Sequence, residues 1–347
     1  MAHSERVRNL SVGEYYLRQY EKSARSLAFD ASSPISLEQW QKGFYEKLKE
    51  CLGPFPQGCD LDPEVIEIVD GGSYWREKVI FNSEPDMAVV AYVLVPKDIQ
   101  DGETRPAILA CHGHGNGKDD IVGLDHGEMR RRNKISETNY DYAHVLAKRG
   151  YVVVAPDWRR WGERHLGGDV APRDPCNVFF IKGMLMGLNL LTLNIWDAIR
   201  SIDYLQSRPE VDPDRIGCVG LSYGGTMALY TSAMDKRVKC AVISGYLNSF
   251  EDYAIGLSNF CGAQTPVGLL KYGEMSDIGC LVAPRPLLIE SGRADSGFPI
   301  KSSRKAAEKV KRAYQVAEVP DRFEVDEFEG GHRWSGSKAY DWLDSWL

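Results

Sequence analysis

The sequence contains no long apolar run and no basic segment followed by an apolar one at its start. No stretch of about 18 consecutive apolar residues occurs, the length a membrane-spanning helix needs. Residues 1–9 are polar and charged, unlike an export signal. These absences predict a protein that is cytoplasmic and has no membrane partner.

Close cysteine pairs are also missing. The eight cysteines include no CxxC pair, and several of them fall inside apolar runs, where a thiol behaves as a small hydrophobe. Structural zinc sites usually take their ligands from close Cys or His pairs. His112 and His114 form the only tight pair, and the sequence offers them no convincing third ligand. We therefore expect free buried thiols, no metal and no other cofactor.

The sequence has no excess of basic residues either. Its 347 residues include 42 basic and 49 acidic ones, giving a net charge of −7. Nucleic acid is therefore not an expected partner. The one basic cluster, residues 130–134, is predicted to be a solvated loop between elements. The sequence leaves both a monomer and a homo-oligomer open.

Apolar strand-like segments alternate with helical segments from Pro106 onward. This alternation predicts an α/β fold, with a mostly parallel central sheet covered by helices on both faces. Residues 1–60 predict a helical N-terminal extension. The main domain, residues 61–347, is expected to carry insertions near 162–189 and 247–282. The expected strands are residues 65–69, 77–81, 87–95, 107–111, 151–155, 216–219, 240–244, 286–290 and 323–328.

One glycine-flanked serine stands where a predicted strand meets a predicted helix. The segment is Gly220-Leu221-Ser222-Tyr223-Gly224, and it has the pattern of a nucleophile elbow, a strained turn that exposes a reactive serine. The helix that follows would direct its first N–H groups toward a developing oxyanion. We therefore predict Ser222 as nucleophile and the Tyr223 amide as one oxyanion donor.

A second oxyanion donor is expected from the turn after strand 107–111. Glycine alternates with other residues in the turn His112 to Gly117, which lets the backbone approach a substrate. The His114 amide is the predicted donor. Metal ligation and plain loop packing remain alternative roles for His112 and His114.

A serine nucleophile needs a histidine base, and that base needs an acid to orient it. His332 is the only histidine after Ser222, and it follows the strand 323–328. Asp295 follows the strand 286–290 and is the predicted acid, with Asp326 and Glu329 as rivals. The order Ser, Asp, His, each residue after its own strand, predicts a catalytic triad.

These motifs resemble those of the α/β-hydrolase superfamily across residues 65–347. Within that superfamily, the chain resembles a bacterial branch that includes dienelactone-hydrolase-like and acetyl-xylan-esterase-like proteins. The resemblance implies an esterase that acts on a small-molecule ester, with short-chain acyl or acetyl esters expected and no cofactor. It rests on the segments HGHGNGK, DWRRWGER, IWDAIRSIDYL, GLSYGG and APRPLLIESGRAD.

Other functions remain open. GLSYGG is also similar to the elbow of prolyl-oligopeptidase-type peptidases, but no repeat of about 40 to 50 residues that would form a propeller is present. An acyltransferase or a carbon–carbon bond hydrolase would use the same triad, and a non-catalytic role would use none of it. Four aromatic residues are expected near the pocket: Trp158, Trp161, Tyr246 and Trp334. For each of them the sequence leaves two roles open, packing in the core or contact with the substrate.

Overall fold

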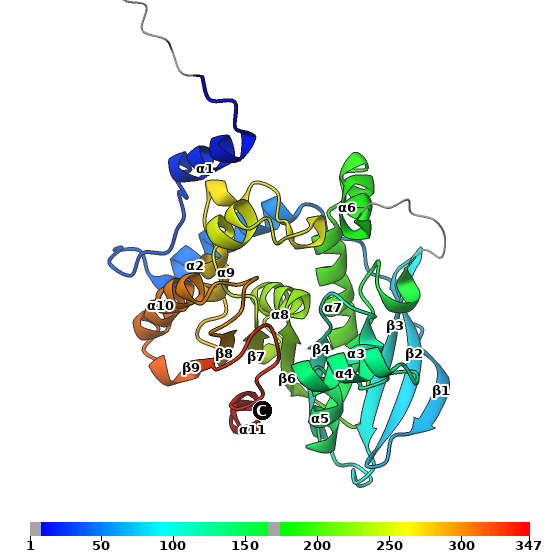
Figure 1. Ribbon diagram of the computed structural model, residues 1–347. Helices are drawn as coiled ribbons and strands as arrows, with labels where there is room; N and C mark the ends of the chain where they lie inside the picture. The colour runs from blue at the N-terminus through cyan, green and yellow to red at the C-terminus, as the bar shows by residue number, and fades with distance from the viewer. Residues whose placement is uncertain (1–7, 166–173) are drawn as a thin grey trace, which may run out of the picture.

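A nine-stranded sheet forms the centre of the protein (Figure 1). The computed structural model describes residues 8–165 and 174–347. The strand order across the sheet is β1-β2-β3-β5-β4-β6-β7-β8-β9. The strands are β1 (Glu64–Asp70), β2 (Tyr74–Glu84), β3 (Met87–Pro96), β4 (Arg105–Cys111), β5 (Val152–Pro156), β6 (Val211–Leu221), β7 (Val238–Ser244), β8 (Leu287–Gly292) and β9 (Phe323–Phe328).

Strand direction divides this sheet into two parts. β1, β2, β3 and β5 pair antiparallel in that order, whereas β5, β4, β6, β7, β8 and β9 form a parallel block. The prediction of an α/β fold with a mostly parallel sheet is confirmed. All carboxyl ends of the parallel block lie at one edge, where ligands bind in open α/β sheets.

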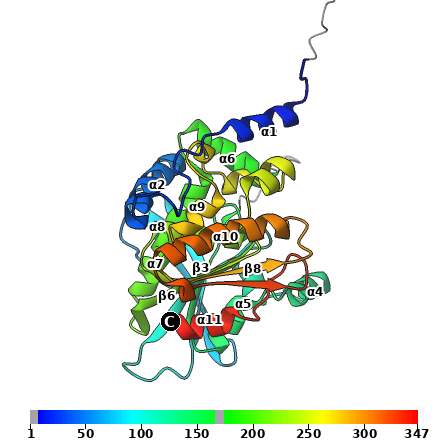
Figure 2. The same cartoon turned by 90° about the vertical axis from the view of Figure 1, so that its left-hand side faces the viewer.

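Helices cover both faces of the sheet. Alternate residues of β4 show this directly, because Leu109 and Cys111 belong to one apolar cluster while Ile108 and Ala110 belong to the other. Figure 2 shows α10 and α11 on opposite sides of β8 and β9. One face packs against α7 (Leu190–Gln206), α8 (Tyr223–Met234), α9 (Met275–Cys280) and α10 (Ile300–Val316), and the other against α3 (Lys118–Ile121), α5 (Tyr142–Lys148) and α11 (Ala339–Trp346).

Two helices precede the sheet. α2 (Leu37–Leu52) begins after Ser36, whose hydroxyl accepts a hydrogen bond from the Gln39 amide at 3.2 Å. Its buried residues include Phe44 and Leu48, which join the main apolar cluster. α1 (Val12–Lys22) buries only Tyr20 and stands away from the sheet in Figure 1.

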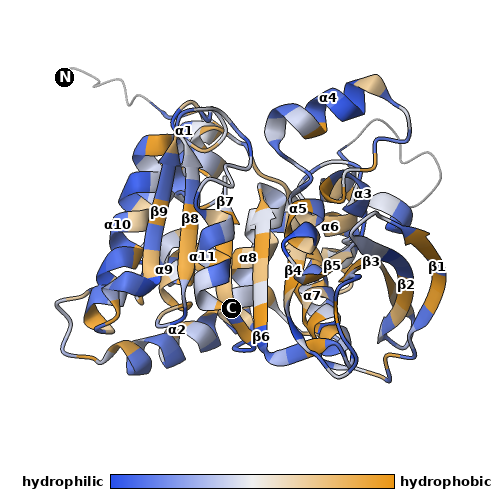
Figure 3. Ribbon diagram, turned by 90° about the horizontal axis from the view of Figure 1, so that it is seen from below, coloured by the Kyte–Doolittle hydropathy of each residue, from blue (hydrophilic) through white to orange (hydrophobic). Residues whose placement is uncertain are grey.

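The segment 130–134 is helical, so the prediction of a solvated loop is wrong. It lies in α4 (Met129–Thr138), where only Ile135 is buried. Figure 3 shows this helix as mostly hydrophilic. Arg and Lys have good helix propensity, and Arg131 is fixed by an ion pair with Asp120 at 2.7 Å. The sequence lacked an apolar period that would have signalled the helix.

Both expected insertions contain short helices. Residues 166–173 of the first insertion lie outside the described residues. In the described parts, no single helix is long and apolar enough to cross a membrane; α6 and α7 together reach that length but meet at a 95° bend. The first insertion contains η1 (Gly162–Arg164) and α6 (Pro175–Leu185). The second contains η2 (Phe250–Gly256), η3 (Gly262–Gln264), η4 (Leu269–Lys271) and α9. Outside the insertions, η5 (Pro320–Arg322) precedes β9.

Gly224→Ala tests how closely the turn after β6 packs. A Cβ on Gly224 would lie 2.0 Å from the Cys111 carbonyl oxygen, and backbone cannot move aside as a side chain can. We expect a loss of about 3 kcal/mol or more in the free energy of unfolding, measured by urea titration.

Gly43→Ala in α2 is the matched control. A Cβ there meets nothing within 4 Å, and alanine is the better helix former by about 1 kcal/mol. Equal stability of the two variants would contradict the packing argument.

Candidate active site

Ser222 occupies a strained turn between β6 and α8. Its φ of 64° and ψ of −122° lie in a region that non-glycine residues rarely adopt. Two backbone hydrogen bonds hold it there: its amide donates to the Ser244 carbonyl at 2.9 Å, and its carbonyl accepts from the Thr226 amide at 3.0 Å. The geometry is that of a nucleophile elbow.

Glycines make this turn sterically feasible. A Cβ on Gly220 would lie 2.3 Å from the Gly224 carbonyl oxygen, and a Cβ on Gly113 would lie 2.8 Å from that of Leu221. The elbow therefore packs backbone against backbone with the turn after β4. This contact places the His112–Gly117 turn beside Ser222.

His332 and Asp295 form a hydrogen-bonded pair. The His332 Nδ1 lies 2.6 Å from the Asp295 Oδ2. The other carboxylate oxygen of Asp295 accepts from the amides of Gly297 at 2.9 Å and Phe298 at 3.0 Å. The Phe298 ring stacks on the imidazole with centroids 5.4 Å apart. The Asp295 side chain is 2% exposed and that of His332 is 38% exposed. Asp295 is therefore shielded from solvent, whereas His332 is accessible to it.

Backbone contacts between the loops after β8 and β9 create this pair. A Cβ on Gly292 would lie 2.4 Å from the Gly331 carbonyl oxygen, and the Ala294 amide donates to the Gly330 carbonyl at 2.8 Å. The two rival acids lie elsewhere. Asp326 accepts from the Ser335 and Ser337 hydroxyls, and Glu329 is exposed and pairs with Arg293.

Ser222, Asp295, His332 and His114 all line one cavity of about 500 Å³. It lies at the carboxyl ends of the parallel strands, under the two insertions. Apart from those four residues, its lining has more polar side chains than apolar ones. The remaining lining residues are Asp174, Ser258, Asn259, Phe260, Cys261, Gln264, Ser296, Gly297 and Phe298.

The two backbone amides predicted as oxyanion donors belong to residues beside the elbow. Tyr223 begins α8, where the first N–H groups of a helix have no intrahelical acceptor. In the facing turn, the Gly113 amide already donates to the Tyr140 hydroxyl at 2.6 Å. The next amide along belongs to His114. The structure thus brings the predicted donors Tyr223 and His114 to the elbow.

His112 has a structural position beneath the site. Its Nδ1 lies 2.8 Å from the Gly113 carbonyl and so donates to it, while its Nε2 accepts from the Trp158 amide at 3.1 Å. Burial lowers the pKa of this imidazole. His112 therefore stays neutral and holds the turn, which favours loop packing over metal ligation at this residue.

Asp157 connects the turn after β4 to the segment after β5. Its carboxylate accepts from the Lys118 amide at 2.7 Å and from the Lys118 Nζ at 2.8 Å, and also from the Glu163 amide at 2.9 Å. Burial would lower the pKa of Lys118, but Asp157 and Glu163 outweigh it and raise that pKa. This buried ion pair fixes the base of the loop that carries His114.

The four aromatic residues predicted near the pocket are buried, and none of them lines the cavity. Trp158 donates from Nε1 to the His112 carbonyl at 3.2 Å. Trp161 stacks on Tyr223, with centroids 4.6 Å apart. These large rings fill space between the elbow and neighbouring loops. Of the two roles that the sequence left open, they therefore have the one in core packing. Tyr246 and Trp334 are likewise almost fully buried.

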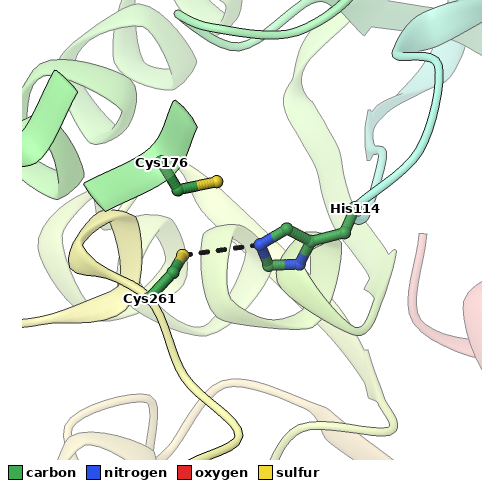
Figure 4. A group of neighbouring side chains, drawn as sticks. All are labelled: His114, Cys176 and Cys261. Atoms are coloured by element: carbon green, nitrogen blue, oxygen red, sulfur yellow. Dashed lines mark hydrogen bonds between the residues drawn. The ribbon is translucent and has the colours of Figure 1, made fainter. Parts of the chain in front are cut away.

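Two cysteines near His114 were not predicted as part of the site. Cys261 Sγ lies 3.4 Å from His114 Nε2, and Cys176 stands beside them (Figure 4). Cys176 comes from α6 and Cys261 from the segment before η3, so their sequence spacing gives no hint of the cluster. All eight cysteines are free, and seven of them are buried, whereas Cys59 is only partly buried, so the prediction of buried thiols fails at that residue.

A buried acid anchors the loop that carries His332. Glu290 lies on β8 and accepts from the amides of Ser335 at 3.2 Å and Gly336 at 2.9 Å. It is fully buried, and burial raises its pKa to about 7 from an ordinary value of 4.5. A carboxyl group that releases its proton only near neutral pH therefore lies beneath the loop that carries His332.

The fold and this site define an α/β-hydrolase, with a serine elbow and a His–Asp pair at the carboxyl edge of a parallel sheet. The chain belongs to the Abhydrolase family, whose model matches residues 16–341.

Among curated proteins, the chain is 27% identical over 315 residues to "Putative hydrolase YtaP" of Bacillus subtilis, covering 87% of this chain and 98% of that protein. It is 30% identical over 169 residues to the uncharacterized protein PA2218 of Pseudomonas aeruginosa, covering 49% of this chain and 36% of that protein.

Solved structures share the fold at lower sequence identity. A "putative acetyl xylan esterase" from Bacteroides fragilis has a TM-score of 0.77 at 21% identity, covering 94% of this chain and 84% of its own. A glucuronoyl esterase from Solibacter usitatus has a TM-score of 0.65 at 17% identity, covering 92% and 95% of the two chains. At these identities, the similarity concerns the fold.

Glu290→Gln tests the buried acid through the pH dependence of stability. The folded protein holds the Glu290 proton up to about pH 7, whereas the unfolded chain releases it near pH 4.5. Stability contributed by this group is present below pH 4.5 and declines as the pH rises to about 7, by up to about 3 kcal/mol. Urea unfolding at several pH values should show that the variant lacks this decline.

Glu324→Gln on β9 is the control, because the Glu324 side chain is 43% exposed. It should keep the wild-type profile. If Glu290→Gln also kept that profile, Glu290 would not be the group responsible.

Proposed function

We propose that the protein is a serine hydrolase that cleaves carboxylic esters through Ser222, His332 and Asp295. The observation that carries the proposal is geometric. All three residues line one cavity, and His332 Nδ1 is held 2.6 Å from Asp295 Oδ2. Their chain order, Ser, Asp, His, is the order of α/β-hydrolases.

The hydrogen bonds support a role for each group in the proposed reaction. Because Asp295 holds the Nδ1 proton of His332, the Nε2 of His332 is free to take the proton of the Ser222 hydroxyl. Ser222 Oγ then forms a bond to the ester carbonyl carbon, and the carbonyl oxygen becomes an oxyanion near the amides of Tyr223 and His114.

The oxyanion collapses and the carbon–oxygen bond to the alcohol breaks. The alcohol leaves with the proton from His332. Water then attacks the acyl-enzyme with His332 as base, which releases the carboxylic acid and restores Ser222. Asp295 orients the imidazole and stabilises its cation, and its own second oxygen is occupied by the Gly297 and Phe298 amides.

The cavity lining supports a short acyl group on a polar alcohol. Amide, hydroxyl and carboxylate side chains outnumber apolar ones around Ser222. A long acyl chain would leave these polar groups without hydrogen-bond partners, whereas a carbohydrate would satisfy them. Acetyl or other short-chain esters of sugars are therefore the proposed substrates, in keeping with the esterases that share the fold.

A peptidase is the second candidate. The chain is 25% identical over 175 residues to dipeptidyl-peptidase 5 of Porphyromonas gingivalis and 26% identical over 205 residues to human dipeptidyl peptidase 8. It covers only 20% and 18% of those proteins, however. Acyl transfer and carbon–carbon bond hydrolysis would use the same three residues, and product analysis with competing alcohols separates them.

Ser222→Ala tests the nucleophile. Hydrolysis of p-nitrophenyl acetate should fall in kcat by about 10⁴-fold or more, because the remaining groups cannot form the acyl-enzyme. Ser345→Ala is the control, since Ser345 is an exposed hydroxyl on α11. It should keep full activity. Activity retained in Ser222→Ala would reject the proposed mechanism.

Substrate class is tested with the wild-type enzyme. We expect kcat/KM to be higher for p-nitrophenyl acetate than for the octanoate, and acetic acid to be released from acetylated xylo-oligosaccharides. Dipeptidyl p-nitroanilides should not be cleaved. Preference for the octanoate would contradict the polar-alcohol assignment, and cleavage of the anilides would favour the peptidase.

A further inference from the structure

Three ligand-type side chains from separate parts of the chain meet at the wall of the cavity. His114 comes from the turn after β4, Cys176 from the start of α6 and Cys261 from the segment before η3. One imidazole nitrogen and the two sulfur atoms all lie within 4.8 Å of one another. Figure 4 shows both thiols directed toward the imidazole edge.

We propose that His114, Cys176 and Cys261 form a binding site for Zn²⁺. A mixed nitrogen and sulfur ligand set is the one that zinc prefers. Ligand atoms at about 2.0 to 2.3 Å from a tetrahedral zinc ion stand about 3.5 to 3.8 Å apart. The 3.4 Å between His114 Nε2 and Cys261 Sγ is close to that spacing.

A second cysteine pair shows what distinguishes this cluster. Cys111 and Cys218 have sulfur atoms 3.7 Å apart, but both are fully buried in the apolar cluster on one face of the sheet. Neither belongs to a group of three ligand-type side chains among the described residues. Two thiols in a closed apolar core have no third ligand and no entry path. The cluster at His114 has a third ligand and opens to the cavity.

Packing fixes the elements that carry the three ligands. The Gly262 amide donates to Asn177 Oδ1 at 2.9 Å, which ties the segment after Cys261 to the helix of Cys176. A Cβ on Gly262 would lie 2.2 Å from the Phe180 side chain, so these segments are in direct contact. A site held this way needs little rearrangement to bind a metal ion.

The imidazole of His114 is also held from its own side. It packs edge-on against Trp161 at 5.5 Å between centroids and lies 5.2 Å from the Tyr223 ring. These two rings therefore orient the third ligand toward the thiols. The buried aromatics beneath the elbow thus support the metal site as well as the serine.

Three protein ligands leave a fourth coordination position, as in zinc sites that bind water or a substrate group. His114 and Cys261 line the same cavity as Ser222, so that position is reachable from the cavity. Two thiolates balance the charge of Zn²⁺, and binding releases their protons. The bound ion would link the His114 turn to both insertions and so restrain the cavity wall.

The experiment measures zinc binding directly and without ester turnover. Metal-free protein in a non-thiol reductant is titrated with Zn²⁺ against a chromophoric chelator. We expect one equivalent bound per chain and a melting temperature that rises with zinc, since a ligand specific to the folded state stabilises it. Co²⁺ in place of Zn²⁺ should give a thiolate charge-transfer absorption.

Cys176→Ser and Cys261→Ser should each weaken zinc binding by about 100-fold or more and remove the charge-transfer band. Cys59→Ser is the matched control, because Cys59 lies outside the cluster. It should bind as the wild type does. His114→Gln changes an exposed side chain and so gives a second variant that should fold while losing a ligand. Circular dichroism verifies that each variant is folded.

Three results would overturn the proposal: no zinc uptake at micromolar concentrations, uptake that persists in the Cys176→Ser/Cys261→Ser double variant, or a Cys176–Cys261 disulfide that survives the reductant. Ser222→Ala should bind zinc normally. The metal site and the esterase proposal therefore fail or succeed independently.

Discussion

Backbone-to-backbone packing between the elbow after β6 and the turn after β4 is the constraint on which the site depends. The position of a Cβ on Gly224 is 2.0 Å from the Cys111 carbonyl oxygen, closer than any side chain tolerates. Only because both segments lack side chains there does Ser222 reach its positive φ and stand beside the His114 amide. A wider separation would move Ser222, the proposed nucleophile, away from the His114 amide, its proposed oxyanion donor.

Backbone-to-backbone packing at glycines also occurs on the other side of the cavity. Gly292 and Gly331 bring the loops after β8 and β9 into backbone contact, and the Asp295–His332 pair forms above that contact. Buried polar side chains beneath the loops also hold the His114 loop and the His332 loop in place through hydrogen bonds. Asp157 and Lys118 hold the base of the His114 loop, and Glu290 accepts from two amides of the loop that follows His332. Buried ions and acids are tolerated here because their hydrogen bonds are satisfied.

The sequence predicted much of the fold, because apolar runs and glycine-flanked turns are local signals. All nine expected strands are present. α4 was missed because it buries only Ile135 and so has no apolar period. The roles expected for the four aromatic residues were harder to predict, since a tryptophan in a core and one in a pocket look the same in sequence.

The sequence by itself determined the elbow, the order of Ser222, Asp295 and His332, and the strand after which each one stands. These follow from local patterns, because the carboxyl ends of parallel strands must meet at one edge. Only the tertiary structure decided that Asp295, and not Asp326, pairs with His332, and that Cys176 and Cys261 lie beside His114. Those contacts join segments far apart in the chain, and their formation depends on how loops pack, which no local pattern encodes.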